Sequence, residues 1–153
     1  MKIAIGCDHL ALGLKNTLYD YLAEQTIVPV EVIDMGVNDS TPVDYPDIAE
    51  KVALAVANGD ADRGILICGT GIGMSIAANK VPGIRAAQAH DVYSAERARK
   101  SNNAQILCLG ALVIGPELAK SILAAWLPAE FAGGRSAPKV EKIMQIEARH
   151  MHK

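Results

Sequence analysis

Residues 65–75 read ILICGTGIGMS, and this stretch decides the fold. The apolar run Ile65–Ile67 is typical of a strand buried on both faces of a parallel sheet. Cys68 follows it, and three alternating glycines lead into a helical pattern. A strand that passes through a short loop into a helix is the repeating unit of α/β proteins. Two kinds of site fit the stretch: a glycine loop that binds a nucleotide, or a thiolate at a helix N-terminus.

The same unit recurs along the chain. Short β-rich runs lie at Lys2–Gly6, Val28–Met35, Gly64–Cys68, Ile84–Ala89 and Ile106–Gly110. Helical patterns follow them at Leu10–Gln25, Tyr45–Asn58, Gly71–Lys80, His90–Asn102 and Pro116–Leu127. The alternation predicts right-handed βαβ crossovers, and therefore a three-layer α/β/α sandwich around a five-stranded parallel sheet of the Rossmann-like, doubly wound kind.

Length and composition favour one domain. The chain has 153 residues, half of them hydrophobic, which is enough for a core of its own. We predict a single domain over residues 1–149 and a tail at 150–153. Residues 128–149 form a Gly/Pro-rich arm and an extra C-terminal helix from about Lys139 to Arg149. We expect this segment to pack on a partner subunit, with folding back as the alternative.

Several classes of protein are excluded. A net charge of −2, with only one Trp, one Phe and four Tyr, lacks the electrostatic and stacking features of a nucleic-acid-binding protein. No segment resembles a secretory signal or reaches the length of a membrane span, so we expect a cytoplasmic protein with no membrane partner. The odd number of cysteines, Cys7, Cys68 and Cys108, fits reduced thiols.

The nucleotide hypothesis fits the glycines poorly. Ligands of doubly wound sheets bind beyond the carboxyl ends of the strands, where this chain carries Asp8-His9, Cys68-Gly69-Thr70 and His90-Asp91. A dinucleotide fingerprint needs a small residue at its sixth position, but the two glycine registers place Met74 or Ile76 there. Asp91 does lie about twenty residues beyond the glycines, which is the spacing of the acidic residue that binds the ribose in a dinucleotide fold.

The thiolate hypothesis fits better. The amides that open the helix at Gly71–Ser75 carry the partial positive charge of a helix N-terminus and attract anions. A cysteine beside them is stabilised as a thiolate, which makes Cys68 a candidate base or nucleophile. The same amides are suited to stabilise a developing oxyanion. The alternatives are a buried apolar role for Cys68 and a helix-capping role for Thr70.

Several motifs occur together in one order. They are Asp8-His9, Asp44-Tyr45-Pro46, CGTGIG at 68–73, SIAANK at 75–80, GIRA at 83–86, YSA at 93–95 and GGR at 133–135. In this order they resemble the ribose-5-phosphate isomerase B family, whose relatives include galactose-6-phosphate and allose-6-phosphate isomerases. The resemblance runs from Met1 to about Arg149.

The resemblance implies an aldose–ketose isomerase that acts on a sugar phosphate through a cis-enediol, without metal or cofactor. It also implies a homodimer with active sites at the subunit interface, with a dimer of dimers left open. By resemblance Cys68 is the base, Thr70 handles protons or holds the substrate, and Ser101 occupies a third catalytic position. The substrate-binding residues implied are Asp8, His9, Tyr45, Gly69, Gly71, Ile72, Gly73, Ser75 and Asn102, and the phosphate-binding ones are His9, Arg135 and Lys139.

Three positions depart from the family pattern. Ser101 replaces the histidine that opens the furanose ring, and serine is a poor general acid or base near neutrality. Leu112 and Lys139 stand where many members carry arginine. A tetrose 4-phosphate needs no ring opening, because its terminal hydroxyl is blocked. We therefore predict that the substrate pair is erythrulose 4-phosphate and erythrose 4-phosphate.

Other hypotheses stay open. His90 is a candidate for the lost imidazole, which would restore ribose 5-phosphate or a hexose 6-phosphate as substrate. A non-catalytic sugar-phosphate-binding subunit is another alternative, although Cys68 argues against it. The last is a metal hydrolase built on Asp8, His9, His90 and Asp91, although these residues lack the spacing of metal ligands.

Overall fold

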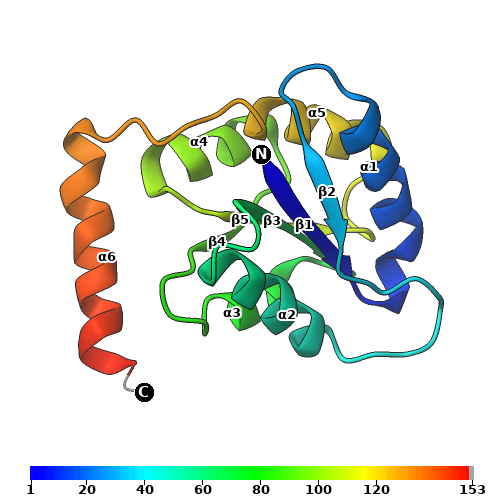
Figure 1. Cartoon of the computed structure of the whole chain (residues 1–153), viewed down its shortest axis with the longest axis horizontal. Helices are drawn as coiled ribbons and strands as arrows, with labels where there is room; N and C mark the ends of the chain where they lie inside the picture. Colours follow the sequence, from blue (N-terminus) through cyan, green and yellow to red (C-terminus); the bar gives the residue numbers. More distant parts are fainter. Residues whose placement is uncertain (152–153) are drawn as a thin grey trace.

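The computed structural model describes residues 1–151 and consists of one parallel sheet covered on both faces by helices (Figure 1). The strands are β1 (Lys2–Cys7), β2 (Glu31–Asp34), β3 (Arg63–Cys68), β4 (Ala86–Gln88) and β5 (Ile106–Gly110). Their order across the sheet is β2-β1-β3-β5-β4, and every neighbouring pair is parallel. The predicted α/β/α fold is confirmed.

The helices form the outer layers. They are α1 (Leu12–Glu24), α2 (Tyr45–Ala57), α3 (Ile72–Ala78), α4 (Val92–Asn102), α5 (Pro116–Trp126) and α6 (Ala137–His150), with short 3-10 turns η1 (His9–Ala11) and η2 (Gly134–Ser136). Figure 1 shows α1, α4 and α5 on one face of the sheet and α2 and α3 on the other. None of the helices in residues 1–151 is long and apolar enough to cross a membrane.

The central strand β3 serves both cores. Ile65 and Ile67 point into the core that contains Trp126 of α5, whereas Leu66 and Cys68 point into the core that contains Met74 of α3. All six residues of β3 are buried. This is why the strand reads as a continuous apolar run rather than an alternating one.

The edge strands are shorter than predicted. The observed β2 is Glu31–Asp34 in place of Val28–Met35, and β4 is Ala86–Gln88 in place of Ile84–Ala89. Both lie at the edges of the sheet, where a neighbour on one side only supports the ladder. The helix predicted from Gly71 to Lys80 is also shorter, because Gly71 has a positive φ of 76° and precedes the first helical residue.

The C-terminal segment stands apart from the sandwich in Figure 1. After α5 the chain crosses a linker to η2 and α6. Two contacts hold the last turns of α6 near the loop before β4: the Gly83 amide donates to the Glu147 carboxylate, at 2.9 and 3.0 Å, and the Arg85 guanidinium contacts the Met144 sulfur at 3.0 Å. Residue 150 of the predicted tail belongs to α6, and residues 152–153 lie outside the described residues.

Candidate active site at the carboxyl ends of β1 and β3

The order of the strands reverses at the boundary between β1 and β3. From β1 the chain moves outward to β2 and then crosses to β3 on the other side of β1. Ligands in open α/β sheets bind beyond the carboxyl ends of the strands at such a point. A cleft of about 540 Å³ lies there. Its lining residues are Asp8, Leu10, Tyr45, Cys68, Gly69, Thr70, Ile72, Gly73, Ile76 and Leu112.

Cys68 lies at the base of this cleft. It is the last residue of β3 and only 5 % exposed. Its sulfur accepts a hydrogen bond from the Gly71 amide at 3.1 Å. The loop that leads into α3 thus aims a backbone N–H group at the sulfur from within the cleft.

Glycine is required in this loop for close backbone packing. A Cβ at Gly71 would lie 2.9 Å from the backbone carbon of Leu109, and one at Gly110 would lie 2.7 Å from backbone atoms of Thr70. The β3–α3 loop therefore lies directly against the end of β5. A Cβ at Gly73 would lie 2.5 Å from the Tyr45 ring, so this ring covers the start of α3.

The start of α3 supplies free amides beside Cys68. N–H groups in the first turn of a helix have no carbonyl partner within that helix. Thr70 satisfies one of them, since its hydroxyl accepts from the Ile72 amide at 3.3 Å. The N-cap of α3 is Gly71 rather than Thr70, so the capping alternative for Thr70 is wrong by one residue, and Thr70 lines the cleft.

Asp8 and His9 follow β1 directly. The Asp8 carboxylate is buried and accepts from the Leu10 amide at 3.1 Å, which starts η1. The His9 Nδ1 accepts from the Val43 amide at 3.3 Å, and this leaves its Nε2 as the free ring nitrogen. Asp8 lines the cleft, whereas His9 lies beside it, next to the loop that leads to Tyr45.

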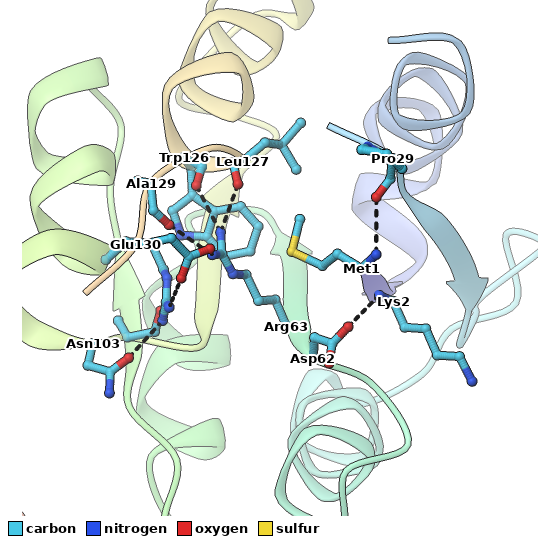
Figure 2. A network of polar contacts seen from close by, with 12 residues as sticks. Met1, Lys2, Pro29, Asp62, Arg63, Asn103, Trp126, Leu127, Ala129 and Glu130 are labelled. Atoms are coloured by element: carbon cyan, nitrogen blue, oxygen red, sulfur yellow. Dashed lines mark hydrogen bonds and ion pairs between the residues drawn. The ribbon is translucent and has the colours of Figure 1, made fainter. Parts of the chain in front are cut away.

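Ser101 and Asn102 lie at the opposite edge of the sheet. They end α4, which begins after the carboxyl end of β4 and finishes before the amino end of β5. Their neighbour Asn103 lies close to Glu130 in Figure 2, among residues at the amino ends of β1 and β3. The Ser101 hydroxyl accepts a hydrogen bond from the Arg97 guanidinium. One protomer therefore does not bring Ser101 or Asn102 to Cys68.

Arg135 and Lys139 lie on the C-terminal arm. Arg135 is in η2 and Lys139 in the first turn of α6, and both are exposed. The linker that precedes them runs along the end of α4, where the Ala132 amide donates to the Lys100 carbonyl at 3.1 Å. The predicted site residues thus form two groups: one around Cys68, and one made of Ser101, Asn102, Arg135 and Lys139.

A family model described as Ribose/Galactose Isomerase matches residues 3–143. The chain belongs to the ribose/galactose isomerase family. It is 59 % identical to a Listeria innocua protein named ribose-5-P isomerase B, over 98 % of this chain and 99 % of the relative. It is 58 % identical to a Pectobacterium atrosepticum protein named D-erythrulose-4-phosphate isomerase, over 99 % of both chains.

A solved structure agrees with these relatives. The ribose-5-phosphate isomerase B of Clostridium thermocellum superposes with a TM-score of 0.94 at 52 % identity, over 98 % of this chain and 99 % of that one. The sequence-based prediction of the family is confirmed, and with it the enzyme class. The protein is an aldose–ketose isomerase of the ribose/galactose family.

His90 has a structural role in this family member. Its Nε2 accepts from the Gly110 amide at 2.9 Å, and burial lowers the pKa of the ring. Asp91 accepts from the Ser94 amide at 2.7 Å and caps α4. Within residues 1–151 no three His, Cys, Asp or Glu side chains converge as a metal site. Neither residue lines the cleft.

Ser75 is also placed away from the cleft. Its hydroxyl donates to the Ala86 carbonyl at 3.2 Å and so ties α3 to β4. The Asn79 side chain binds the same strand, with its amide nitrogen donating to the Ala86 carbonyl and its oxygen accepting from the Ala86 amide. This part of the SIAANK motif therefore fixes the helix on the sheet.

Sequence reasoning missed the apolar wall of the cleft. Leu10, Ile76 and Leu112 line it and are 59 %, 59 % and 76 % exposed. A Cβ at Gly69 would lie 3.3 Å from the Leu112 methyl group. The signal was available, because each of these residues flanks a reactive motif, but a helical pattern alone does not tell an exposed leucine from a buried one.

Lys15 was missed as well. It is fully buried, and its amine donates to both Asp34 oxygens at 2.9 and 2.8 Å, and to the Val37 carbonyl and the Asn38 side chain at 2.7 Å each. These contacts hold the loop after β2. The same loop supplies Gly36, whose carbonyl accepts from the Cys7 amide at 2.7 Å, so Lys15 supports the end of β1 that carries Asp8.

Proposed function

We propose that the protein interconverts D-erythrulose 4-phosphate and D-erythrose 4-phosphate through a cis-enediolate, with Cys68 as the base. The observation that carries this proposal is the Cys68 sulfur, which lies in the cleft and accepts the Gly71 amide at 3.1 Å. We assign the base to Cys68 because its sulfur is a nucleophilic group that lies in the cleft and faces a backbone donor.

The proton moves between two neighbouring carbons. Starting from the aldose, the Cys68 thiolate takes the proton from C2, and the C2 electrons form the double bond of an enediolate whose charge rests on the former carbonyl oxygen at C1. The thiol then returns the proton to C1, which gives the ketose, while the hydroxyl proton passes from one oxygen to the other. We assign this second transfer to the Thr70 hydroxyl.

The enediolate is stabilised by the backbone. The amides of the β3–α3 loop and of the first turn of α3 lie beside Cys68 and already point towards the cleft end of the helix. Preorganised donors at a developing oxyanion form one of the largest catalytic contributions in enzymes. Tyr45 and Asp8 then hold the sugar hydroxyls from the two sides of the loop.

We propose that the active enzyme is a dimer. Ser101, Asn102, Arg135 and Lys139 lie away from Cys68 of the same chain, so only a second copy can bring them to it. The exposed apolar residues around the cleft, Leu10, Ile76 and Leu112, and those on α6, Ile143 and Ile146, are suited to be covered by that copy. His9 with the partner arm's basic residues then binds the phosphate.

Ser101 supports the tetrose. Ring opening needs an acid or base that titrates near neutrality, which serine does not offer. His90 does not replace it, because its Nε2 is bound to the Gly110 amide outside the cleft. Ribose 5-phosphate is the second candidate substrate, and the Listeria relative named ribose-5-P isomerase B favours it. Three free, buried thiols suit a reducing cytoplasm.

The test is kcat/KM for D-erythrose 4-phosphate and D-ribose 5-phosphate, measured side by side without added metal. We expect the tetrose to be preferred. Preference for ribose 5-phosphate would overturn the role given to Ser101 but keep Cys68 as the base. A Cys68→Ser protein that binds either sugar phosphate without turning it over supports the base, and equal turnover by this variant contradicts it.

A further inference from the structure

Glu130 joins three separate parts of the chain. It lies in the linker between α5 and the C-terminal arm, and its carboxylate contacts two arginines (Figure 2). The Glu130 Oε1 accepts a hydrogen bond of 2.6 Å from the guanidinium of Arg63, which starts β3. The Glu130 Oε2 lies 3.6 Å from a guanidinium nitrogen of Arg99, which lies on α4. We call Arg63, Arg99 and Glu130 the arm clasp.

The two arginines form a rigid base. The Arg63 guanidinium also donates to the carbonyls of Trp126, Leu127 and Ala129 at 2.8 to 3.1 Å. It lies over the Trp126 ring, 5.2 Å from its centre. Both arginines are less than a tenth exposed, whereas the Glu130 side chain is 76 % exposed. The carboxylate is therefore the movable member of the clasp.

Arg99 connects the clasp to the end of α4. Its guanidinium donates to the Ala104 carbonyl at 2.9 Å and to the Asn103 side chain at 3.1 Å. Burial and the positive charge of Arg63 lower the pKa of Arg99 to about 10, and the Glu130 charge opposes that shift. A neutral side chain at position 130 would leave two buried cations without a shared carboxylate.

The clasp therefore fixes the arm relative to Asn102. A second tie, from the Ala132 amide to the Lys100 carbonyl at 3.1 Å, acts on the same linker two residues later. Asn102 lies two residues beyond Lys100, and Arg135 lies three beyond Ala132. Asn102, the proposed sugar contact, and Arg135, the proposed phosphate contact, are thus both anchored close to the tie between Lys100 and Ala132.

We propose that Glu130 is a positioning residue that selects the sugar chain length. This proposal rests on the proposed function, in which Asn102 and Arg135 of one subunit hold the two ends of a single substrate in the partner's cleft. A braced arm sets the separation between these ends, and a tetrose is one carbon shorter than a pentose. When the arm is released, either length fits about equally well.

The experiment compares Glu130→Gln with the wild-type enzyme. Its readout is the ratio of kcat/KM on D-erythrose 4-phosphate to that on D-ribose 5-phosphate. We expect the ratio to move towards one by about tenfold, mainly through KM, since small displacements of substrate-positioning groups have effects of this order. Glu117→Gln is the matched control, because it removes an exposed glutamate that pairs with Lys120 on the same helix, away from the arm.

The outcomes separate a positioning role from a structural one. If Glu130→Gln only weakens the fold, both substrates lose kcat/KM by the same factor, and the unchanged ratio overturns the proposal. If this variant does not fold, Glu130→Asp keeps the charge on a shorter side chain, and an unchanged ratio there has the same meaning. A wild-type enzyme inactive on both sugars overturns the proposed function, whereas an active one with an unmoved ratio overturns the clasp alone.

Discussion

At the carboxyl edge of the sheet helices begin and their free amides face a cleft, whereas at the amino edge helices end and their free carbonyls are bound by arginine. The Gly71 amide donates to the Cys68 sulfur at the first edge. At the second edge the Arg63 guanidinium donates hydrogen bonds to the carbonyls of Trp126, Leu127 and Ala129. Helices that alternate with parallel strands always place their starts and ends in this way.

The difference shows why backbone donors for an anion gather at one edge of the sheet. Free amides stabilise anions, so the carboxyl edge suits a thiolate and an enediolate without further side chains. Free carbonyls need donors, and at the amino edge two buried arginines supply them. The first edge presents a cleft to a ligand, and the second holds the arm through Glu130.

The largest effect is expected from Cys68→Ala. If Cys68 is the base as proposed, we expect kcat/KM to fall by about 10³-fold, within the usual range for a general base. Cys7→Ala is the matched control, since burial raises the pKa of that thiol to about 11 and keeps it protonated. Similar losses in both variants, measured in the same assay, would show that packing rather than the thiolate matters.

Arg63→Met tests the amino edge of the sheet. Three carbonyls lose a buried donor, so we expect the free energy of unfolding to fall by about 3 kcal/mol. Urea denaturation measures this change. Lys2→Met is the control, because Lys2 lies at the same edge with an exposed side chain. An unchanged unfolding free energy in Arg63→Met would mean that water satisfies the carbonyls instead, and a fall of the same size in the control would mean that loss of a cation at this edge matters rather than loss of the donor.

Gly71→Ala tests the packing of the cleft loop. The new Cβ combines a positive φ of 76° with a contact of 2.9 Å to the Leu109 backbone. Gly59→Ala has a similar φ of 82° but nothing within 4 Å, so it isolates the backbone strain. We expect Gly71→Ala to lower the unfolding free energy by about 2 kcal/mol more than Gly59→Ala. Equal losses in thermal denaturation would mean that β5 yields to the new methyl group.

The smallest effect concerns pH. Burial lowers the pKa of His90, so the unfolded chain binds more protons than the folded one below about pH 6.5. The stability from this group is therefore present above that pH and is lost as the pH falls through the lowered pKa. His90→Gln keeps an acceptor for the Gly110 amide and removes the titration.

We expect the loss of unfolding free energy between about pH 7.5 and about pH 5.5 to be smaller in His90→Gln, by less than about 1 kcal/mol. Urea denaturation of both proteins at the two pH values measures it. An identical loss in the variant would show that other groups carry the pH dependence.

The sequence by itself determined the fold and the first group of site residues. Strands buried on both faces must be continuous apolar runs, and the reactive residues that end β1 and β3 must meet because parallel strands end at one edge. Asp8, Tyr45, Cys68 and Thr70 do line one cleft. The ends of β2 and β4 were not predicted well, because pairing on one side depends on the neighbouring strand rather than on local sequence.

Only the tertiary structure decided what surrounds that group. Lys15 reads as an ordinary helix-surface lysine until the loop after β2 is seen to enclose it with four acceptors. Ser101 and Asn102 end a helix as Cys68 ends a strand, yet they lie at the opposite edge, because α4 runs antiparallel to the strands. Local periodicity records which residues are buried, but the direction of each element through the fold places them at one edge or the other.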